Sequence, residues 1–120
     1  MENHKLVLPG DLNQNGYLFG GILLKWVDEY AWIAASLEFP ECKFVTLAMD
    51  EVIFKKSVKE GSILKFDVTH LKTGNTSVRY QVNVICHNSC FENMETIFST
   101  IITFVNVNAE GKKIAIPTLH

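Results

Sequence analysis

The sequence lacks the features that mark a membrane-spanning or secreted chain. Outside the segment Ile22–Leu37 it has no run of about 18 apolar residues, and that segment itself carries Lys25, Asp28 and Glu29. A basic region followed by an apolar core is also missing from Met1–Lys5, so no signal peptide is expected. We therefore expect no membrane partner.

The sequence also lacks an excess of basic charge. It has 11 lysine and arginine residues against 13 aspartate and glutamate residues, which gives a net charge of -2. The basic residues form no long block, and the pair Lys55-Lys56 is followed closely by Lys59-Glu60, a pattern typical of a solvated turn. No nucleic acid is expected as a partner.

Cysteine is scarce. The three cysteines are Cys42, Cys86 and Cys90, an odd number without Cys-x-x-Cys spacing. Two thiols and the imidazole of His87 in the segment 86–90 are too few for a closed zinc shell, and the segment is typical of a loop between strands. We expect reduced, structural thiols in a cytoplasmic protein, and no metal site.

The sequence contains enough apolar residues to form one hydrophobic core. Its 120 residues are 48% hydrophobic, and we expect a single domain over residues 1–120. Two glycines, Gly20 and Gly21, stand before the segment Ile22–Leu37, which has neither glycine nor proline. They allow a tight turn and leave unpaired N–H groups at a helix start, where an oxyanion can bind.

Polar residues fall on one narrow stripe of this helix. At about 100° per residue, Lys25, Asp28, Glu29 and Ser36 share a face, and the other residues are apolar. We therefore expect a sheet on one side of the helix. Its aromatic residues exceed what one thin sheet covers, so further cover, such as another subunit, is expected on the other side; these are Trp26, Tyr30 and Trp32.

Asp28 lies at the edge of the polar stripe, and Glu29 lies nearer its centre. The alanines Ala31 and Ala35 beside Asp28 leave room for another group to approach. Periodicity alone is compatible with two roles for Asp28. It is either the rim of a solvated face, paired with Lys25, or a partly buried carboxylate used in chemistry.

The rest of the chain has the pattern of β-strands. Alternation is clear in Ser62–Leu71 and stricter in Thr76–His87, so each has one buried face. The segment 72–75 has the glycine and asparagine of a hairpin turn. Connections this short require an antiparallel sheet, with the helix across its concave face. The remaining expected strands are Lys5–Leu8, Lys43–Phe54 and Met94–Val107.

Two stretches carry a resemblance to a known family. The first, Asp11–Gly21, contains Asn13 and the paired glycines, and the second, Leu24–Glu29, places Val27-Asp28 on the helix. They resemble the signature of the hotdog-fold acyl-CoA thioesterases of the YciA and brain acyl-CoA hydrolase type. That signature is Asp-x-Asn-x-x-Gly-x-x-(Phe/His)-Gly-Gly, a short gap, then a helix bearing Met/Val-Asp/Glu. The similarity continues through Val45-Thr46, Phe54, Gly61, Thr76-Ser77-Val78, Asn108–Lys112 and Pro117.

The resemblance implies an α+β hotdog fold, with one long central helix wrapped by a five-stranded antiparallel sheet. It implies an acyl-CoA thioesterase of lipid metabolism that works as a homodimer, or as a trimer of dimers. Asn13 of one subunit and Asp28 of the other would act together, and the amides of Gly20 and Gly21 would polarise the thioester carbonyl. By the same similarity, coenzyme A would bind at the turn after the third strand, through Gly74, Asn75, Thr76, Ser77 and Arg79. An ordinary hairpin is the alternative for that turn.

The implied chemistry needs no serine triad, and no Gly-x-Ser-x-Gly elbow is present. Asp28 would act as general base or as nucleophile, with Asn13 positioning water or the carbonyl. No cofactor is expected beyond the coenzyme A of the substrate. Two alternatives stay open: a hotdog hydratase or dehydratase, and a non-catalytic acyl-CoA-binding module. The first generally uses a histidine–carboxylate pair at the helix, and the four histidines all lie off it.

Overall fold

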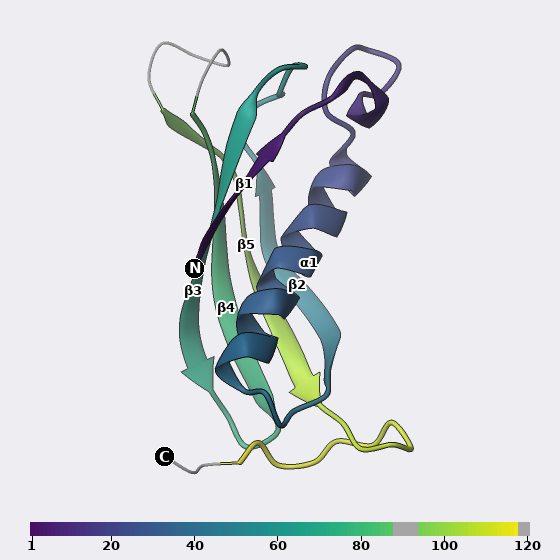
Figure 1. Ribbon diagram of the computed structural model, residues 1–120, viewed down its shortest axis with the longest axis vertical. Coiled ribbons are helices and arrows are strands. Elements are labelled where there is room, and N and C mark those ends of the chain that lie inside the picture. The colour runs from purple at the N-terminus through teal and green to yellow at the C-terminus, as the bar shows by residue number, and fades with distance from the viewer. Residues whose placement is uncertain (88–93, 118–120) are drawn as a thin grey trace.

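A computed structural model describes residues 1–87 and 94–117. It contains one five-stranded sheet in the order β1-β3-β4-β5-β2, in which every neighbouring pair is antiparallel (Figure 1). The α+β fold class and the antiparallel pairing are thus confirmed. The elements are β1 Glu2–Leu6, a 3₁₀ turn Pro9–Asp11, α1 Gly20–Glu38, β2 Phe44–Phe54, β3 Ile63–Thr73, β4 Ser77–Cys86 and β5 Glu95–Asn106.

The first strand differs from its expected range. β1 begins at Glu2 and ends at Leu6, because its residues pair in register with the start of β3, from Glu2 opposite Asp67 to Leu6 opposite Ile63. Pro9 has a fixed φ and no N–H, and it begins a 3₁₀ turn instead of extending the strand. The expected strand Lys5–Leu8 was therefore placed too late along the chain.

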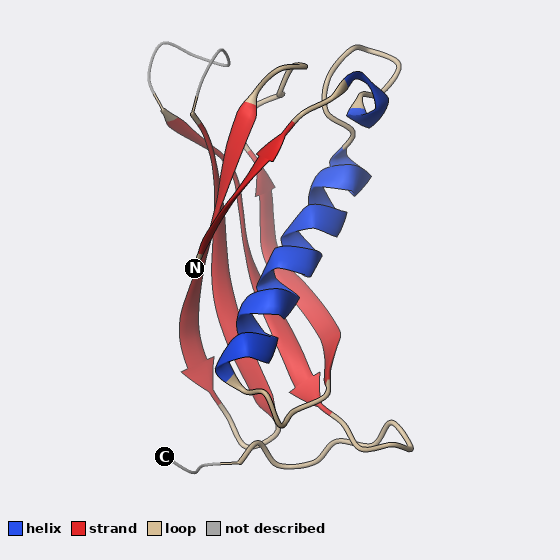
Figure 2. Ribbon diagram, viewed as in Figure 1, coloured by secondary structure: helices blue, strands red, loops and turns tan. Residues whose placement is uncertain are grey.

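The helix α1 lies across one face of the sheet (Figure 2). Its buried residues include Leu23, Val27 and Ala31, which belong to the same core cluster as the inward residues of the strands. Strict alternation in β4 produces this core, since every second residue from Val78 to Cys86 is buried. The helix and the sheet thus share one continuous core.

One side of α1 is covered better than its sequence predicts. Trp26 is only 6% exposed and packs edge-on against Phe66, at 6.3 Å between ring centroids. Tyr30 lies 4.9 Å from the same ring. The expectation that Trp26 needs a second subunit is wrong, because the sheet curves far enough to cover it. Trp32 is different: it is 45% exposed, with its Nε1 donating to the Phe44 carbonyl at 3.1 Å.

The state of one cysteine also differs from what the sequence predicts. Cys42 is a free thiol, but Cys86 is disulfide-bonded, so the expectation of reduced thiols is wrong at Cys86. Residues 88–90 of the segment 86–90 lie outside the described residues. Within residues 1–87 and 94–117, no helix is long and apolar enough to cross a membrane.

Candidate active site

Asp28 sits near the middle of α1, on the side that faces the strand β2. It is half-buried, whereas Glu29 is exposed, as the polar stripe predicts. Its Oδ1 accepts a hydrogen bond from the Thr46 hydroxyl at 2.6 Å. No ion pair joins Asp28 to Lys25 among the described residues. The carboxylate is therefore held by a strand across from the helix, and not by its own helical neighbour.

Asn13 lies in the polar turn before α1. Its Oδ1 accepts two backbone hydrogen bonds, from Asn15 N at 2.9 Å and from Tyr17 N at 3.2 Å. The backbone N–H of Asn13 donates to the Tyr17 carbonyl at 2.7 Å, which closes the turn. Because the oxygen is occupied by the turn, the Nδ2 group is the part of this side chain that can donate to a ligand.

Within one chain the structure does not bring Asn13 and Asp28 together. Asn13 precedes the helix, and Asp28 follows the helix start at Gly20 by eight residues. At about 1.5 Å of rise per residue, that places Asp28 roughly 12 Å along the helix axis. No hydrogen bond or ion pair joins the two side chains in the described part of the chain.

Gly20 and Gly21 form the first turn of α1. Phe19, the residue at the N-cap, makes no side-chain cap, and its carbonyl accepts from the N–H groups of Ile22 and Leu23. The N–H groups of Gly20 and Gly21 have no acceptor among the described residues. Two free donors at the positive end of a helix are what a developing oxyanion requires.

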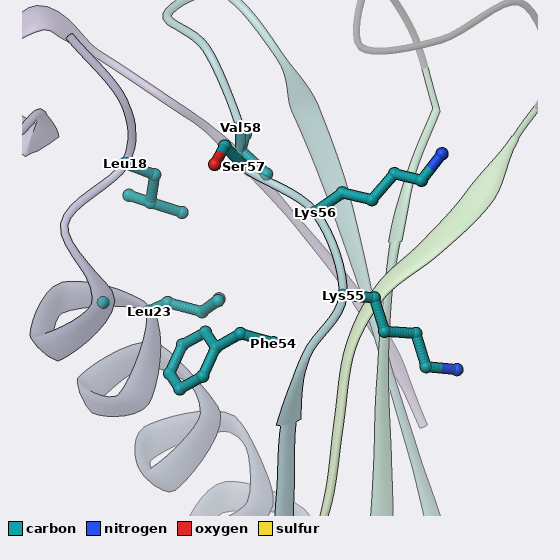
Figure 3. A pocket seen from close by; sticks show the side chains of 8 residues that line it. Leu18, Leu23, Phe54, Lys55, Lys56, Ser57 and Val58 are labelled. Carbon is teal, nitrogen blue, oxygen red and sulfur yellow. The ribbon is translucent and has the colours of Figure 1, made fainter. Parts of the chain in front are cut away.

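A pocket of about 270 Å³ opens beside this helix start (Figure 3). Its wall comes from Gly20 and Leu23 of α1, from the preceding residue Leu18, and from the end of β2 and the segment that follows it. The β2 side contributes Phe54, Lys55, Lys56, Ser57 and Val58.

Neither Thr46 nor Phe54 is predicted as a site residue from the sequence. Thr46 interrupts an apolar stretch of a predicted strand, and Phe54 ends that strand. Both positions belong to the family resemblance, which is the one signal that could have identified them. Neither strand periodicity nor composition indicates which helix residue a strand residue will meet.

The expected coenzyme A turn lies elsewhere in the molecule. Residues 74–76 connect β3 to β4, at the end of the longest axis opposite to the start of α1 (Figure 1). Gly74 N donates to the Ser77 carbonyl at 2.7 Å, and the carbonyls of Asn75 and Thr76 accept from other backbone groups. Within one chain this turn is therefore far from Gly20. Arg79, on β4, lies 4.0 Å from the Asp50 carboxylate.

Solved structures with this fold come from several bacterial thioesterases. The chain superposes on a hexameric hotdog fold thioesterase of Campylobacter jejuni with a TM-score of 0.84 and 32% identity, over 96% of this chain and 88% of the other. It superposes on an acyl-CoA hydrolase from Staphylococcus aureus, in complex with butyryl coenzyme A and coenzyme A, with a TM-score of 0.82 and 28% identity. That match covers 100% of this chain and 73% of the other. The hotdog fold expected from the sequence is confirmed.

Three variants of the S. aureus hydrolase have also been solved. Each has alanine in place of one residue: an asparagine, an aspartate 15 positions later, and a threonine 17 positions after the aspartate.

Sequence comparison leads to the same family. The mouse acyl-coenzyme A thioesterase 11 is 30% identical over 84% of this chain, and a rat cytosolic acyl coenzyme A thioester hydrolase is 29% identical over 95% of it. This chain spans only 17% and 30% of the lengths of those two proteins. The model of the thioesterase superfamily matches residues 15–89, more than half of the chain. The chain therefore belongs to the thioesterase superfamily.

Proposed function

We propose that this chain hydrolyses acyl-CoA thioesters to a free acid and coenzyme A. One observation carries the proposal. Thr46 of β2 holds the half-buried carboxylate of Asp28 on α1, and the amides of Gly20 and Gly21 at the start of α1 have no acceptor in the described part of the chain. The site thus offers a carboxylate to activate water and donors to receive negative charge on oxygen.

The spacing of the site residues supports the proposal. Asn13 and Asp28 are 15 positions apart, the same separation as the asparagine and aspartate replaced in the S. aureus hydrolase. Thr46 follows Asp28 by 18 positions, against 17 for the threonine replaced there. We therefore assign Asn13, Asp28 and Thr46 to one site.

Asp28 supplies the chemistry by one of two routes. As a general base, it takes a proton from water while the water oxygen attacks the carbonyl carbon, the C–S bond breaks, and the proton then passes to the thiolate. As a nucleophile, it attacks the carbonyl carbon itself, the C–S bond breaks, and coenzyme A leaves as a thiolate that takes a proton from water; a water molecule then hydrolyses the resulting anhydride to the free acid and the Asp28 carboxylate. Label found in Asp28 after single turnover in ¹⁸O-labelled water identifies the anhydride route, because only attack of water on the anhydride's aspartyl carbon places the label there.

The site takes Asn13 and Asp28 from two subunits, because one chain does not bring them together. The edge strand β2 favours such a dimer, since it pairs only with β5 among the described strands and exposes apolar side chains such as Leu47, which is 56% exposed. Antiparallel pairing of two β2 strands about a two-fold axis would set the two α1 helices in opposite directions. The start of one helix would then lie beside the middle and end of the other.

The same two-fold arrangement supports the coenzyme A assignment. Opposed chains would place the β3–β4 turn of one subunit at the same end of the dimer as Gly20 and Gly21 of its partner. We propose that Gly74, Asn75, Thr76 and Ser77 of this turn, with Arg79 beyond it, contact the phosphates of coenzyme A. Three such dimers would form the hexamer seen for the C. jejuni protein.

The proposed reaction uses water as its only second reactant. No metal or cofactor takes part, and coenzyme A enters as part of the substrate. We propose that the chain acts in the cytoplasm, as a homo-oligomer in lipid metabolism, without a nucleic-acid or membrane partner.

The test is release of free thiol from acyl-CoA by the purified protein, followed with a thiol reagent. We expect saturable, protein-dependent release for at least one saturated acyl-CoA. Tight binding of acyl-CoA without thiol release would instead identify a binding module. Hydration of an enoyl-CoA without thiol release would identify a hydratase, and either result would overturn the proposal.

A further inference from the structure

The pocket at the start of α1 has an apolar side, and one aromatic ring lies next to that side. Leu18, Leu23 and Val58 are buried in its wall. Phe54 points from the end of β2 toward the helix (Figure 3), and its ring lies 3.6 Å from the position that a Cβ on Gly20 would take. The residue Phe54 is 53% exposed, and its ring packs against that of the buried Phe98, at 4.9 Å between centroids.

Two lysines also line the pocket, on the side formed by the end of β2 and the segment that follows it. The side chains of Lys55 and Lys56 point away from Leu18 and Leu23 (Figure 3). Lys56 Nζ also forms an ion pair with Glu95 at 2.8 Å. The part of the pocket next to the helix start, between Leu18, Leu23 and the Phe54 ring, is therefore suited to an apolar chain.

The pocket adjoins the proposed oxyanion donors, because Gly20 lines the pocket and also supplies one of the two N–H groups. When the carbonyl oxygen of a thioester accepts hydrogen bonds from the amides of Gly20 and Gly21, the carbonyl carbon lies one bond from that oxygen. The α-carbon of the acyl group is one bond further, at the pocket mouth. The apolar wall is then the surface that the acyl chain meets.

We propose that this pocket holds the acyl chain and that Phe54 sets the chain length. The inference rests on the proposed thioesterase function and adds the substrate class. A methylene group takes roughly the 30 Å³ share of one water molecule, so a pocket of about 270 Å³ holds about eight or nine carbons. The preferred substrates are therefore medium-chain acyl-CoA thioesters.

The experiment measures kcat/KM for saturated acyl-CoA from two to sixteen carbons. For the wild-type protein we expect about a fourfold rise per added carbon, from the transfer free energy of one methylene, until the pocket is full near eight carbons. Phe54→Ala removes the ring and moves the maximum to longer chains by about three or four carbons. Phe54→Trp fills more of the pocket and moves the maximum to shorter chains.

Leu71→Ala is the matched control. Leu71 is an apolar residue of β3 that is 47% exposed, close to the exposure of Phe54, and it does not line the pocket. Its profile should keep the wild-type maximum. Sedimentation of each variant must show the wild-type assembly, so that a change of profile reports on the pocket and not on the loss of a subunit contact.

The outcomes separate this inference from the function on which it rests. If the wild-type protein hydrolyses acyl-CoA and both Phe54 variants keep its maximum, the acyl pocket is refuted and the thioesterase function stands. If the Phe54 variants change all chain lengths equally and alter inhibition by free coenzyme A, the pocket holds the pantetheine arm, and the inference is wrong. Absence of thiol release at every chain length overturns both.

Discussion

The Thr46 hydroxyl donates to Asp28 Oδ1 at 2.6 Å and so joins the edge strand β2 to the middle of α1. A carboxylate on a helix surface is otherwise free to rotate among several rotamers. The hydrogen bond restricts Asp28 and occupies one of its oxygens, while the second oxygen stays available for a proton or a carbonyl carbon. Thr46 is thus a positioning residue for the proposed reaction.

Replacing Thr46 by valine should lower kcat with little change in KM. Valine keeps the branched shape but removes the donor, and a hydrogen bond worth about 1.4 kcal/mol corresponds to about a tenfold loss of rate. Thr46→Ser restores the hydroxyl and should recover most of kcat. Steady-state kinetics on one acyl-CoA provide the measurement. A valine variant with wild-type kcat, or a serine variant as slow as valine, would contradict this role.

Asp28→Asn should leave the fold intact and remove most of the thioesterase activity. The amide keeps the size of the carboxylate but cannot accept a proton or attack the carbonyl, and general-base catalysis contributes about 100-fold or more to rate. Thiol release and thermal unfolding should be measured together. Turnover near the wild-type rate would show that Asp28 is structural. The matched control, Glu29→Gln on the exposed face of the same helix, should keep its activity.

Mixing two inactive variants tests whether each site is shared between subunits. In a two-fold dimer of Asn13→Ala with Asp28→Ala, one site keeps both groups and the other lacks both. With random exchange about half the dimers are mixed, so activity should recover to roughly a quarter of the wild-type value. Native mass spectrometry confirms the exchange. A site contained in one chain predicts no recovery at any mixing ratio.

The chain should be no smaller than a dimer at micromolar concentration. The edge strand β2 exposes Val45, Leu47 and Ile53, and the adjacent helix exposes Trp32 and Leu37, a set of apolar side chains that a second copy would cover. Sedimentation velocity provides the measurement. Leu47→Glu should shift the protein toward monomer and reduce thiol release with it, whereas a stable wild-type monomer would exclude the shared site.

Tyr80 should make the protein lose stability in alkaline solution. Burial, followed by the hydrogen bond and the charge of Glu38, raises the pKa of the Tyr80 hydroxyl, which donates to Glu38 at 2.6 Å. The folded state keeps this proton while an unfolded tyrosine loses it above about pH 10. The stabilisation is therefore complete below about pH 10 and is lost as the pH rises from there toward the raised folded pKa.

Denaturant titrations of the wild-type protein and Tyr80→Phe between pH 7 and 11 provide the measurement. At pH 7 the variant should be less stable by about 1–2 kcal/mol, because it lacks the hydrogen bond. Above about pH 10 the difference should shrink, since only the wild-type protein loses the contribution of this proton. A difference that stays constant to pH 11 would show that Tyr80 ionises equally in both states.

Apart from the N-terminal strand, local patterns in the sequence are enough to place the helix, the strands and their inward faces. Leu64, Phe66 and Val68 alternate with polar residues, and all three are buried in β3, because side chains of a strand point to opposite faces with a period of two. The polar stripe of the helix likewise separated the half-buried Asp28 from the exposed Glu29. Such patterns arise from the local backbone geometry of strands and helices, so they are visible in the order of the residues alone.

Which distant residues meet depends on the tertiary fold. β2 shifts register against β5 between Thr46 and Ala48 and again between Asp50 and Ile53, and Glu51 within the second shift has a φ of 53°. An irregular strand of this kind loses the simple alternation, so period alone cannot place the Thr46 hydroxyl opposite Asp28 or the Phe54 ring beside Gly20. Those contacts depend on how the sheet curves around the helix, because long-range packing and register, and not local periodicity, fix them.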